Sequence, residues 1–321
     1  MKVFVAGANG ALGIPLTHRL MDHGHDVIGM TRSETGASEL RMLGAHPVIA
    51  DAFDREALLR ATDGLAADVV VHELTALTKP PLRVSGMDQT NGLRSEGSRN
   101  LVEVARQIGA RRFVTQSIIF GYGFSNHGDE VLTEAAPFGK PEGKPTDGIL
   151  AALVDAEALA GEAGEGIALR YGLLYGGDAP NIVPLLRRRM VPVAEGGVLG
   201  WIHHHDAAAA TVAAIEKGVP GAYNIVDDQP ATFEQMFTTM AEAIGAPRPW
   251  KLPRWLMSLV APYVVAFGMD TQLRVSNEKA ANELGWRPRY PSYREGIAAM
   301  AGSLREDAAG ARTSARRPTQ P

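Results

Sequence analysis

The sequence predicts an α/β fold, a doubly wound parallel sheet followed by a smaller C-terminal substrate-binding region. Two observations carry this prediction. Short apolar runs alternate with stretches of helical periodicity through the first half of the chain, and a turn with three glycines directly follows the first run. Such alternation joins parallel strands through crossover helices, so both faces of the sheet are covered.

The expected strands are short and rich in β-branched residues, as buried strands are. Between them, stretches such as Leu12 to His23 and Thr90 to Ile108 have the spacing of amphipathic helices. The strand runs are VFVAG (3–7), DVIGMT (26–31), PVIAD (47–51), DVVVHEL (68–74), RFVTQSII (112–119), IALRYGLLYG (167–176) and AYNIVD (222–227).

These elements divide the chain into two closely associated parts. We expect a dinucleotide-binding domain over residues 1–178, with a returning strand near 200–226, and a substrate-binding region over 179–307. Residues 308–321 lack a hydrophobic period and are expected to be a disordered tail. The segment from Phe124 to Pro145 is dense in glycine, proline and acids, which predicts a mobile loop over a site.

Composition indicates a folded protein that handles small molecules. The chain has 321 residues, 45% of them hydrophobic, and its formal charge of -4 offers no basic field to a nucleic acid. It has no cysteine, which excludes disulfides and thiolate chemistry. The N-terminus lacks a signal-peptide core, so a cytoplasmic location is expected. The uncharged stretch from Trp255 to Met269 is shorter than the roughly 20 residues that span a bilayer, so no membrane span is expected.

The glycine turn predicts a dinucleotide site of the Rossmann type. Gly7, Gly10 and Gly13 stand three residues apart, between a buried strand and a helix. A turn this tight lets a pyrophosphate approach the helix N-terminus, where free N–H groups and the helix dipole favour an anion. Asn9, Ala11 and Leu12 complete the cofactor-binding turn.

The end of the second expected strand favours NADP over NAD. NAD binding usually requires a carboxylate at this point, whereas the 2′-phosphate of NADP requires a cation. Thr31 ends the strand and Arg32 follows it. Asp26 lies ~15 Å away at the other end of the strand, too far to contact the ribose.

A series of short motifs follows in a fixed order: GANGALG, VIADAFD, VVHELTAL, EGSRNLVEVAR, FVTQSIIFGYG, LRYGLLYG, WIHHHDAAAA, GAYNIVD and LGWRPRY. Up to about residue 305 the chain therefore resembles the extended short-chain dehydrogenase/reductase family, also called the NAD-dependent epimerase/dehydratase family. The resemblance implies that the three glycines line the pyrophosphate and that the protein is a homodimer. It also implies that Asp51 and Ala52 contact the adenine, and that Leu74, Thr75 and Ala76 contact the adjoining ribose.

The chain departs from this family at the catalytic residues. The family uses a serine together with a tyrosine and a lysine spaced Tyr-x-x-x-Lys on one helix face, where the lysine lowers the pKa of the phenol. Ser117 matches the serine, but Ile149 stands at the tyrosine position and Leu153 at the lysine position. None of the seven tyrosines has a lysine four residues further on. The site is therefore atypical.

Another group must supply the proton, or the reaction must differ. Tyr122 is the candidate donor, and Ser117 is expected to hydrogen-bond the substrate or a water and to border the cofactor. Tyr122, Ile149, Leu153, Tyr171 and His203 are expected to line the substrate pocket. A reaction without an oxyanion, such as hydride addition to an activated alkene or an iminium, would need less from the enzyme.

Several weaker patterns have simpler interpretations. His203 to His205 are consecutive, so their side chains alternate and no metal site is predicted. Asp206 is expected to cap the following helix. His72 is expected to be structural, and Arg187 to Arg189 to form a solvated cationic patch. The stretch from Trp255 to Met269 is interpreted as core, as a cover for an apolar substrate, as a dimer surface or as a surface that contacts a membrane.

The leading functional prediction is an NADP-dependent oxidoreductase that transfers a hydride to or from a small or medium, partly apolar metabolite. One alternative is a non-redox lyase, isomerase or cyclase on the same fold. The other is a non-catalytic, dinucleotide-sensing protein that resembles the NmrA-like branch of the superfamily.

Overall fold

The structure is a computed structural model that describes residues 1–315 except Thr78, Pro80 and Asp178, with the backbone alone over 307–315. Its core is a seven-stranded sheet in the order β10-β7-β5-β4-β1-β2-β3, and all neighbouring strands are parallel. The strands are β1 (Lys2–Ala6), β2 (Asp26–Thr31), β3 (His46–Ile49), β4 (Val69–His72), β5 (Arg112–Ile118), β7 (Glu165–Tyr171) and β10 (Gly221–Ile225). The predicted doubly wound sheet is confirmed.

The strand order reverses between β1 and β4, which are neighbours although β2 and β3 lie between them in the chain. In doubly wound sheets this switch point opens a crevice at the carboxyl ends of the strands, and ligands bind there. The glycine turn follows β1, so the fold places it at this crevice.

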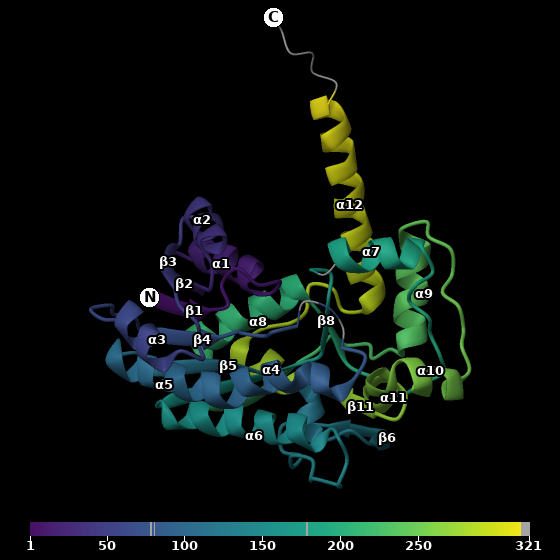
Figure 1. Ribbon diagram of the computed structural model, residues 1–321, viewed down its shortest axis with the longest axis horizontal. Coiled ribbons are helices and arrows are strands. Elements are labelled where there is room, and N and C mark those ends of the chain that lie inside the picture. Colours follow the sequence, from purple (N-terminus) through teal and green to yellow (C-terminus); the bar gives the residue numbers. More distant parts are fainter. Residues whose placement is uncertain (78, 80, 178, 316–321) are drawn as a thin grey trace, which may run out of the picture.

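Helices cover both faces of the sheet (Figure 1). On one face lie α1 (Gly13–Asp22), α2 (Glu34–Met42) and α8 (His204–Lys217), whose apolar residues join one core cluster. On the other face lie α3 (Arg55–Ala61), α5 (Ser98–Gln107) and α6 (Asp147–Glu162). The short segments η1 (Val84–Met87), α4 (Asp88–Gly92) and the π-helical turn η2 (Leu93–Gly97) lead into α5.

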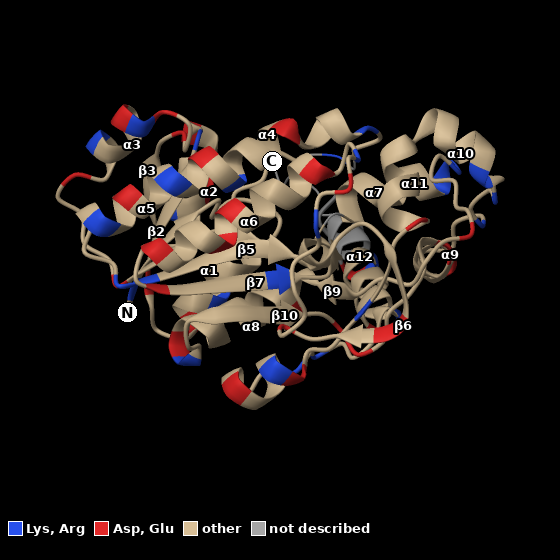
Figure 2. Cartoon of the chain, turned by 90° about the horizontal axis from the view of Figure 1, so that it is seen from below, with Lys and Arg blue, Asp and Glu red and all other residues tan. Residues whose placement is uncertain are grey.

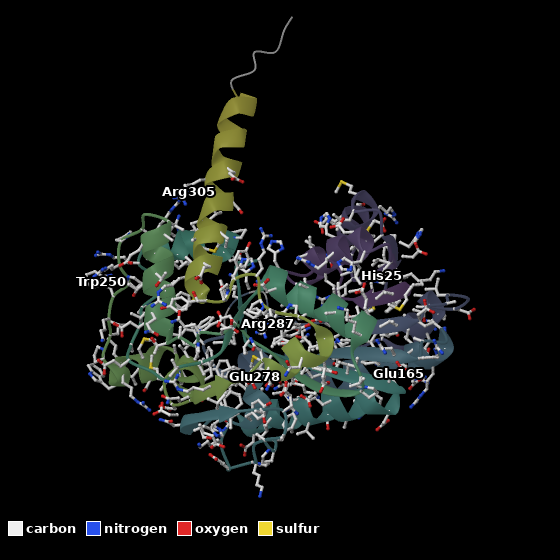
Figure 3. The ribbon with its side chains drawn as sticks, turned by 180° about the vertical axis from the view of Figure 1, so that it is seen from behind. His25, Glu165, Trp250, Glu278, Arg287 and Arg305 are labelled. Carbon is white, nitrogen blue, oxygen red and sulfur yellow. The ribbon has the colours of Figure 1, made fainter. Side chains whose placement is uncertain are left out.

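The second region lies beyond the carboxyl ends of the strands (Figures 1 and 2). Figure 3 shows Glu165, at the amino end of β7, and Trp250, in the second region, on opposite sides of the molecule. The helices of this region are α7 (Ala179–Arg187), α9 (Phe233–Ala243), α10 (Arg254–Val260), α11 (Pro262–Gly268) and α12 (Tyr293–Ala315). It also contains two pairs of strands: β8 (Leu173–Tyr175) pairs with β9 (Trp201–His203), and β6 (Asn126–Leu132) pairs with β11 (Gln272–Val275). The π-helical turn η4 (Ala280–Leu284) packs beside α8.

Two predictions about irregular segments differ from the structure. Seven residues of the expected loop from Phe124 to Pro145 form strand β6, because they pair with the distant strand β11, a contact that no local pattern reveals. The expected tail begins as a helix, since α12 continues to Ala315 through an alanine-rich stretch of high helix propensity. Residues 316–321 of that tail lie outside the described residues.

The surface has no dominant charge. Figure 2 shows basic and acidic residues interspersed over the helices, in keeping with the small formal charge. Among the described residues, no helix combines the length and the apolar character that crossing a membrane requires.

Candidate active site

The glycine turn has the geometry that a dinucleotide site requires. Gly7 has φ +92°, and a Cβ there would lie 2.9 Å from the Glu73 carbonyl oxygen. A Cβ on Gly13 would collide with the Gly7 carbonyl oxygen, so α1 can pack this closely on the turn only with glycine at its start. The Gly10 N–H donates to the Gly7 carbonyl at 2.9 Å and closes the turn.

The N-terminus of α1 is free to bind an anion. Leu12 stands at the N-cap position and no side chain caps the helix. The first N–H groups of a helix have no partner within the helix, and the dipole there favours negative charge. A pyrophosphate group fits this arrangement.

The residues predicted to bind the adenosine part of the cofactor lie near the carboxyl end of β2. A Cβ on Gly36, near the start of α2, would collide with the Thr31 hydroxyl and the Asn9 amide, so only glycine fits there. Arg32 is exposed, and no salt bridge or hydrogen bond to its side chain is found in the part of the chain that the structure describes. Ser33 caps α2 by accepting from the Gly36 N–H at 3.1 Å. Arg32 is thus available to a phosphate.

Asp51 follows β3 and lines an open hollow beside Phe53. Its Oδ1 accepts from the Phe53 N–H at 3.0 Å, while the Ala52 carbonyl accepts from the Asn100 amide at 2.7 Å. Both residues are therefore held rigidly at the edge of the crevice, where the resemblance placed the adenine.

The segment after β4 is held by side chains on both sides. Thr90 accepts from the Ala76 N–H at 3.2 Å and lies 3.4 Å from the Thr75 hydroxyl. His72 donates through Nε2 to the Leu93 carbonyl and accepts at Nδ1 from the Leu74 N–H. Burial lowers the pKa of His72 to about 4, so the ring is neutral and structural, as expected.

Ser117, Arg170 and Asn224 form one row across three neighbouring strands. They are register partners on β5, β7 and β10, so their side chains share one face of the sheet. Glu157 on α6 lies over this row, where it accepts from the Ser117 hydroxyl at 2.6 Å and from Arg170 at 2.8 and 2.9 Å. Ser117 is fully buried and its hydroxyl already has an acceptor in Glu157, so its expected bond to a substrate or water stays a prediction.

Tyr122 belongs to the same network. Its hydroxyl donates to the Asn224 side chain at 2.7 Å and accepts from Arg170 at 3.0 Å. The residue is 3% exposed, and burial raises the pKa of its phenol, which opposes release of a proton. A hydroxyl with both partners in place is poorly suited to the donor role expected from the sequence.

Tyr171 points to the other face of the sheet, away from this row. Its hydroxyl donates to Glu73 at 2.9 Å and lies 2.7 Å from the Thr211 hydroxyl. Tyr171 is fully buried, so it does not line an open pocket as expected. Burial also raises the pKa of Glu73 to about 8, and this carboxyl directly follows β4, a feature that the sequence did not reveal.

The face of α6 that would carry the tyrosine and the lysine is apolar. Ile149 and Leu153 are both fully buried, in a cluster with Tyr122, Phe124 and Tyr263. No hydroxyl or ammonium group can occupy these two positions without displacing that packing. Both residues were expected to line the substrate pocket, but in this structure they pack as core and neither lines the cavity described below.

The histidine run is structural. His203 is 5% exposed, lies 5.2 Å from the Tyr175 ring and 4.7 Å from the Tyr290 ring between centroids, and burial lowers its pKa to about 3. It also caps α8, since its Nδ1 accepts from the His205 N–H at 3.2 Å. Asp206 is not the cap: its carboxylate accepts from the N–H groups of Arg289 and Tyr290 at 3.0 Å.

Two polar residues beside the apolar face of α6 escaped the sequence analysis. Arg94 is 3% exposed although it is charged, and Tyr263 on α11 is 6% exposed. The signal for Arg94 was present, because it stands in helical register with Gly97 and Leu101 on the core face of its helix. No signal tied Tyr263 to it, since 169 residues separate them.

A cavity of about 390 Å³ lies on the outer flank of the 122–150 segment. Tyr122, Phe124, Phe138 and Leu150 supply its apolar walls, and Lys140 and Lys144 stand at its polar side. Within the described residues, no group of three or more histidine, aspartate or glutamate side chains is placed to hold a metal ion.

Comparison with known proteins places these features in context. The family described as the NAD dependent epimerase/dehydratase family matches residues 3–226. A 3-diazoavenalumate denitrifying reductase from a Streptomyces species is 37% identical over 311 residues, 92% of this chain and 99% of that protein. A 2-alkyl-3-oxoalkanoate reductase from Stenotrophomonas maltophilia is 28% identical over 77% of each chain.

Solved structures show the same fold. UDP-glucose 4-epimerase from Thermotoga maritima, solved with UDP-glucose, superposes with a TM-score of 0.76 at 22% identity over 96% of this chain and all of its own. A human epimerase family protein solved with NADPH has a TM-score of 0.76 at 20% identity and covers 95% of this chain and 100% of its own. The reductase names of the sequence relatives support an oxidoreductase activity. The chain belongs to the NAD-dependent epimerase/dehydratase family of extended short-chain dehydrogenases/reductases.

Proposed function

We propose that this protein is an NADP-dependent reductase whose substrate takes up a hydride without needing a proton from the enzyme. One observation carries the proposal: the chain keeps the glycine turn of a nucleotide-binding site at the start of α1, but Ile149 and Leu153 stand on α6 at the two positions where the family carries its tyrosine and lysine. A protein that keeps the glycine turn but lacks the tyrosine and the lysine suits hydride transfer without acid–base catalysis by the enzyme.

The cofactor site is proposed from the crevice residues. Arg32 would pair with the 2′-phosphate of NADP, and the free N-terminus of α1 would bind the pyrophosphate. When bound, NADPH supplies the hydride. The remaining proposed contacts are Gly7, Asn9, Gly10, Ala11, Leu12 and Gly13 in the turn, Thr31 at the ribose, Asp51 and Ala52 at the adenine, and Leu74, Thr75 and Ala76 after β4.

The hydroxyl groups near the site argue against carbonyl reduction. An alkoxide formed from a ketone must receive a proton, normally from a group within hydrogen-bond reach. Ser117 donates to Glu157, Tyr122 to Asn224 and Tyr171 to Glu73. We propose that Ser117 and Tyr122 hold their hydrogen-bond partners in place rather than act as catalysts.

A diazo compound in its diazonium form meets this requirement. It takes up one hydride at the N₂-bearing group, the carbon–nitrogen bond breaks, a carbon–hydrogen bond forms and N₂ leaves. One NADPH becomes NADP⁺, and no proton is needed from the protein. The relative with 37% identity is named as a denitrifying reductase of a diazo compound, which supports this substrate class.

The test is reduction of 4-carboxybenzenediazonium by the purified protein with NADPH. Oxidation of NADPH is followed by absorbance, and released N₂ and benzoate are measured with an enzyme-free control for spontaneous decay. Equimolar NADPH loss, N₂ and benzoate above that control support the proposal. Turnover of ketones without turnover of the diazonium compound would refute it.

A further inference from the structure

Arg94 is a buried cation that has no partner among the residues that the structure describes. Its Nε and Nη1 atoms have no hydrogen-bond partner, and its guanidinium forms no ion pair with any described residue. An unpaired buried charge is costly, so a polar group of this kind calls for a ligand or another functional explanation. Arg94 remains charged at neutral pH, although burial lowers its pKa to about 10.

The position of Arg94 is at the carboxyl edge of the sheet. It lies in the π-helical turn η2, which packs against α6. The Leu93 carbonyl of this turn accepts a hydrogen bond from the His72 ring. Tyr263 on α11 belongs to the apolar cluster that includes Leu153 of α6, so Arg94 and Tyr263 both lie beside that helix. Burial raises the pKa of Tyr263 to about 12, and the nearby charge of Arg94 opposes this rise. Helix α6 covers the opposite face of the sheet from α1, so a pyrophosphate held at α1 is not the counter-ion of Arg94.

Two further polar groups nearby lack partners. The Asn91 Oδ1 atom, one helical turn before Arg94, is buried without a hydrogen bond. Among the described residues the Tyr263 hydroxyl also forms no hydrogen bond, while its backbone N–H donates to the Leu82 carbonyl at 3.1 Å and anchors α11. A guanidinium and a phenol both donate hydrogen bonds, so an oxygen anion can accept from both.

A chain of aromatic rings extends from Tyr263. Tyr263 lies 4.8 Å from Phe267, and Phe267 lies 5.8 Å from Phe120, between ring centroids. Phe120 stacks on Phe124 at 5.0 Å. A planar aromatic body suits such walls, because rings prefer stacked or edge-on neighbours.

We propose that Arg94 and Tyr263 bind the carboxylate of an aromatic substrate and make the enzyme select acids over their neutral derivatives. The inference rests on the proposed function only for the statement that the bound acid is the substrate. Arg94 takes no part in the proton balance of the reaction; it orients the substrate by one charge-assisted contact.

Binding is tested without turnover, by calorimetric titration of the NADP⁺ complex with 4-hydroxycinnamate and with its methyl ester. We expect the wild-type protein to bind the acid at least tenfold more tightly than the ester. Arg94→Met should remove that difference and leave ester binding unchanged, Arg94→Lys should restore part of it, and Tyr263→Phe should weaken acid binding severalfold. Arg99→Met, which removes an exposed arginine from α5, is the matched control.

Thermal melting separates a ligand site from a structural role. Because Arg94 is unpaired, Arg94→Met should keep or raise the melting temperature of the ligand-free protein. A marked fall in melting temperature, equal affinity of the wild type for acid and ester, or equal losses for both in Arg94→Met would overturn the proposal. Loss of diazonium turnover with acid selectivity intact would instead contradict the proposed function alone.

Discussion

The Ser117 hydroxyl donates a hydrogen bond to the Glu157 carboxylate over 2.6 Å, and Arg170 holds the same carboxylate through two more. This contact joins β5, α6 and β7 where the family places a catalytic serine near its tyrosine and lysine. The hydroxyl therefore serves the packing of α6 on the sheet, and predictions for the neighbouring residues follow from that arrangement.

Ser117→Ala should affect stability more than turnover. Glu157 keeps its two bonds to Arg170, so we expect a loss of about 1 kcal/mol in the free energy of unfolding, measured by urea titration. The kcat for NADPH oxidation should stay within about threefold of wild type, since the hydroxyl donates to Glu157 rather than to a reacting atom. A loss of kcat by two orders of magnitude with unchanged stability would make Ser117 a catalyst.

Tyr122→Phe should also keep its activity. The variant removes the partner of both Arg170 and Asn224, so unfolding should become easier by about 1–3 kcal/mol. If Tyr122 were the proton donor, turnover would collapse and the alkaline limb of the pH–rate profile would disappear. The two outcomes are separated by measuring kcat across pH 6 to 9 together with the unfolding curve.

Leu153→Lys puts a lysine back at the position where the family carries one, but we do not expect this lysine to act in catalysis. The ammonium would enter an apolar cluster without a counter-ion, and we expect a loss of about 3 kcal/mol or more in stability. Leu153→Met, of similar volume, should cost less than about 1.5 kcal/mol. Equal melting temperatures for the two variants would show that the position is open to water rather than packed.

Arg32→Ala should raise the KM for NADPH and leave that for NADH nearly unchanged. Loss of a charge-assisted hydrogen bond to a phosphate corresponds to about 1.5–3 kcal/mol, or roughly 10-fold to 100-fold in affinity. Arg41→Ala, on the far side of α2, is the control, because Arg41 already pairs with Glu34. An equal effect of Arg32→Ala on both cofactors would remove the argument for NADP.

Stability should fall as the pH rises from about 6.5 to about 8 and should level off at higher pH. Burial raises the pKa of Glu73 and of Asp227 to about 8, so the folded protein binds more protons there than the unfolded chain. The contribution of each carboxyl is complete below its unfolded pKa and is lost as the pH reaches about 8. The lowered pKa values of His72 and His203 act only below pH 6.5, where they oppose this trend.

The melting temperature measured by calorimetry between pH 6 and 9 checks this expectation. Glu73→Gln removes one of the two carboxyls and should flatten the decline, with the variant more stable than wild type at pH 9. A melting temperature that rises through this range would mean that both carboxyls are already ionised near neutral pH.

Local patterns in the sequence were enough to predict the sheet, its crossover helices and the cofactor turn. Alternation of apolar runs with helical stretches predicts parallel strands joined by crossover helices, and glycine is required wherever a turn and a helix approach as closely as Gly7 and Gly13 do. The replacement of the family's tyrosine and lysine by Ile149 and Leu153 was also visible, because their spacing lies on one helix.

Only the tertiary structure decided which polar groups remain free. Ser117, Tyr122 and Tyr171 are plausible donors in sequence, but partners more than ten residues away, such as Glu157, Asn224 and Glu73, already engage their hydroxyls. Long-range pairing likewise made β6 from a segment without a strand pattern. The same holds for Arg94 and Tyr263: their burial arises from packing between distant segments, and no local periodicity encodes which side chains will be left without a partner.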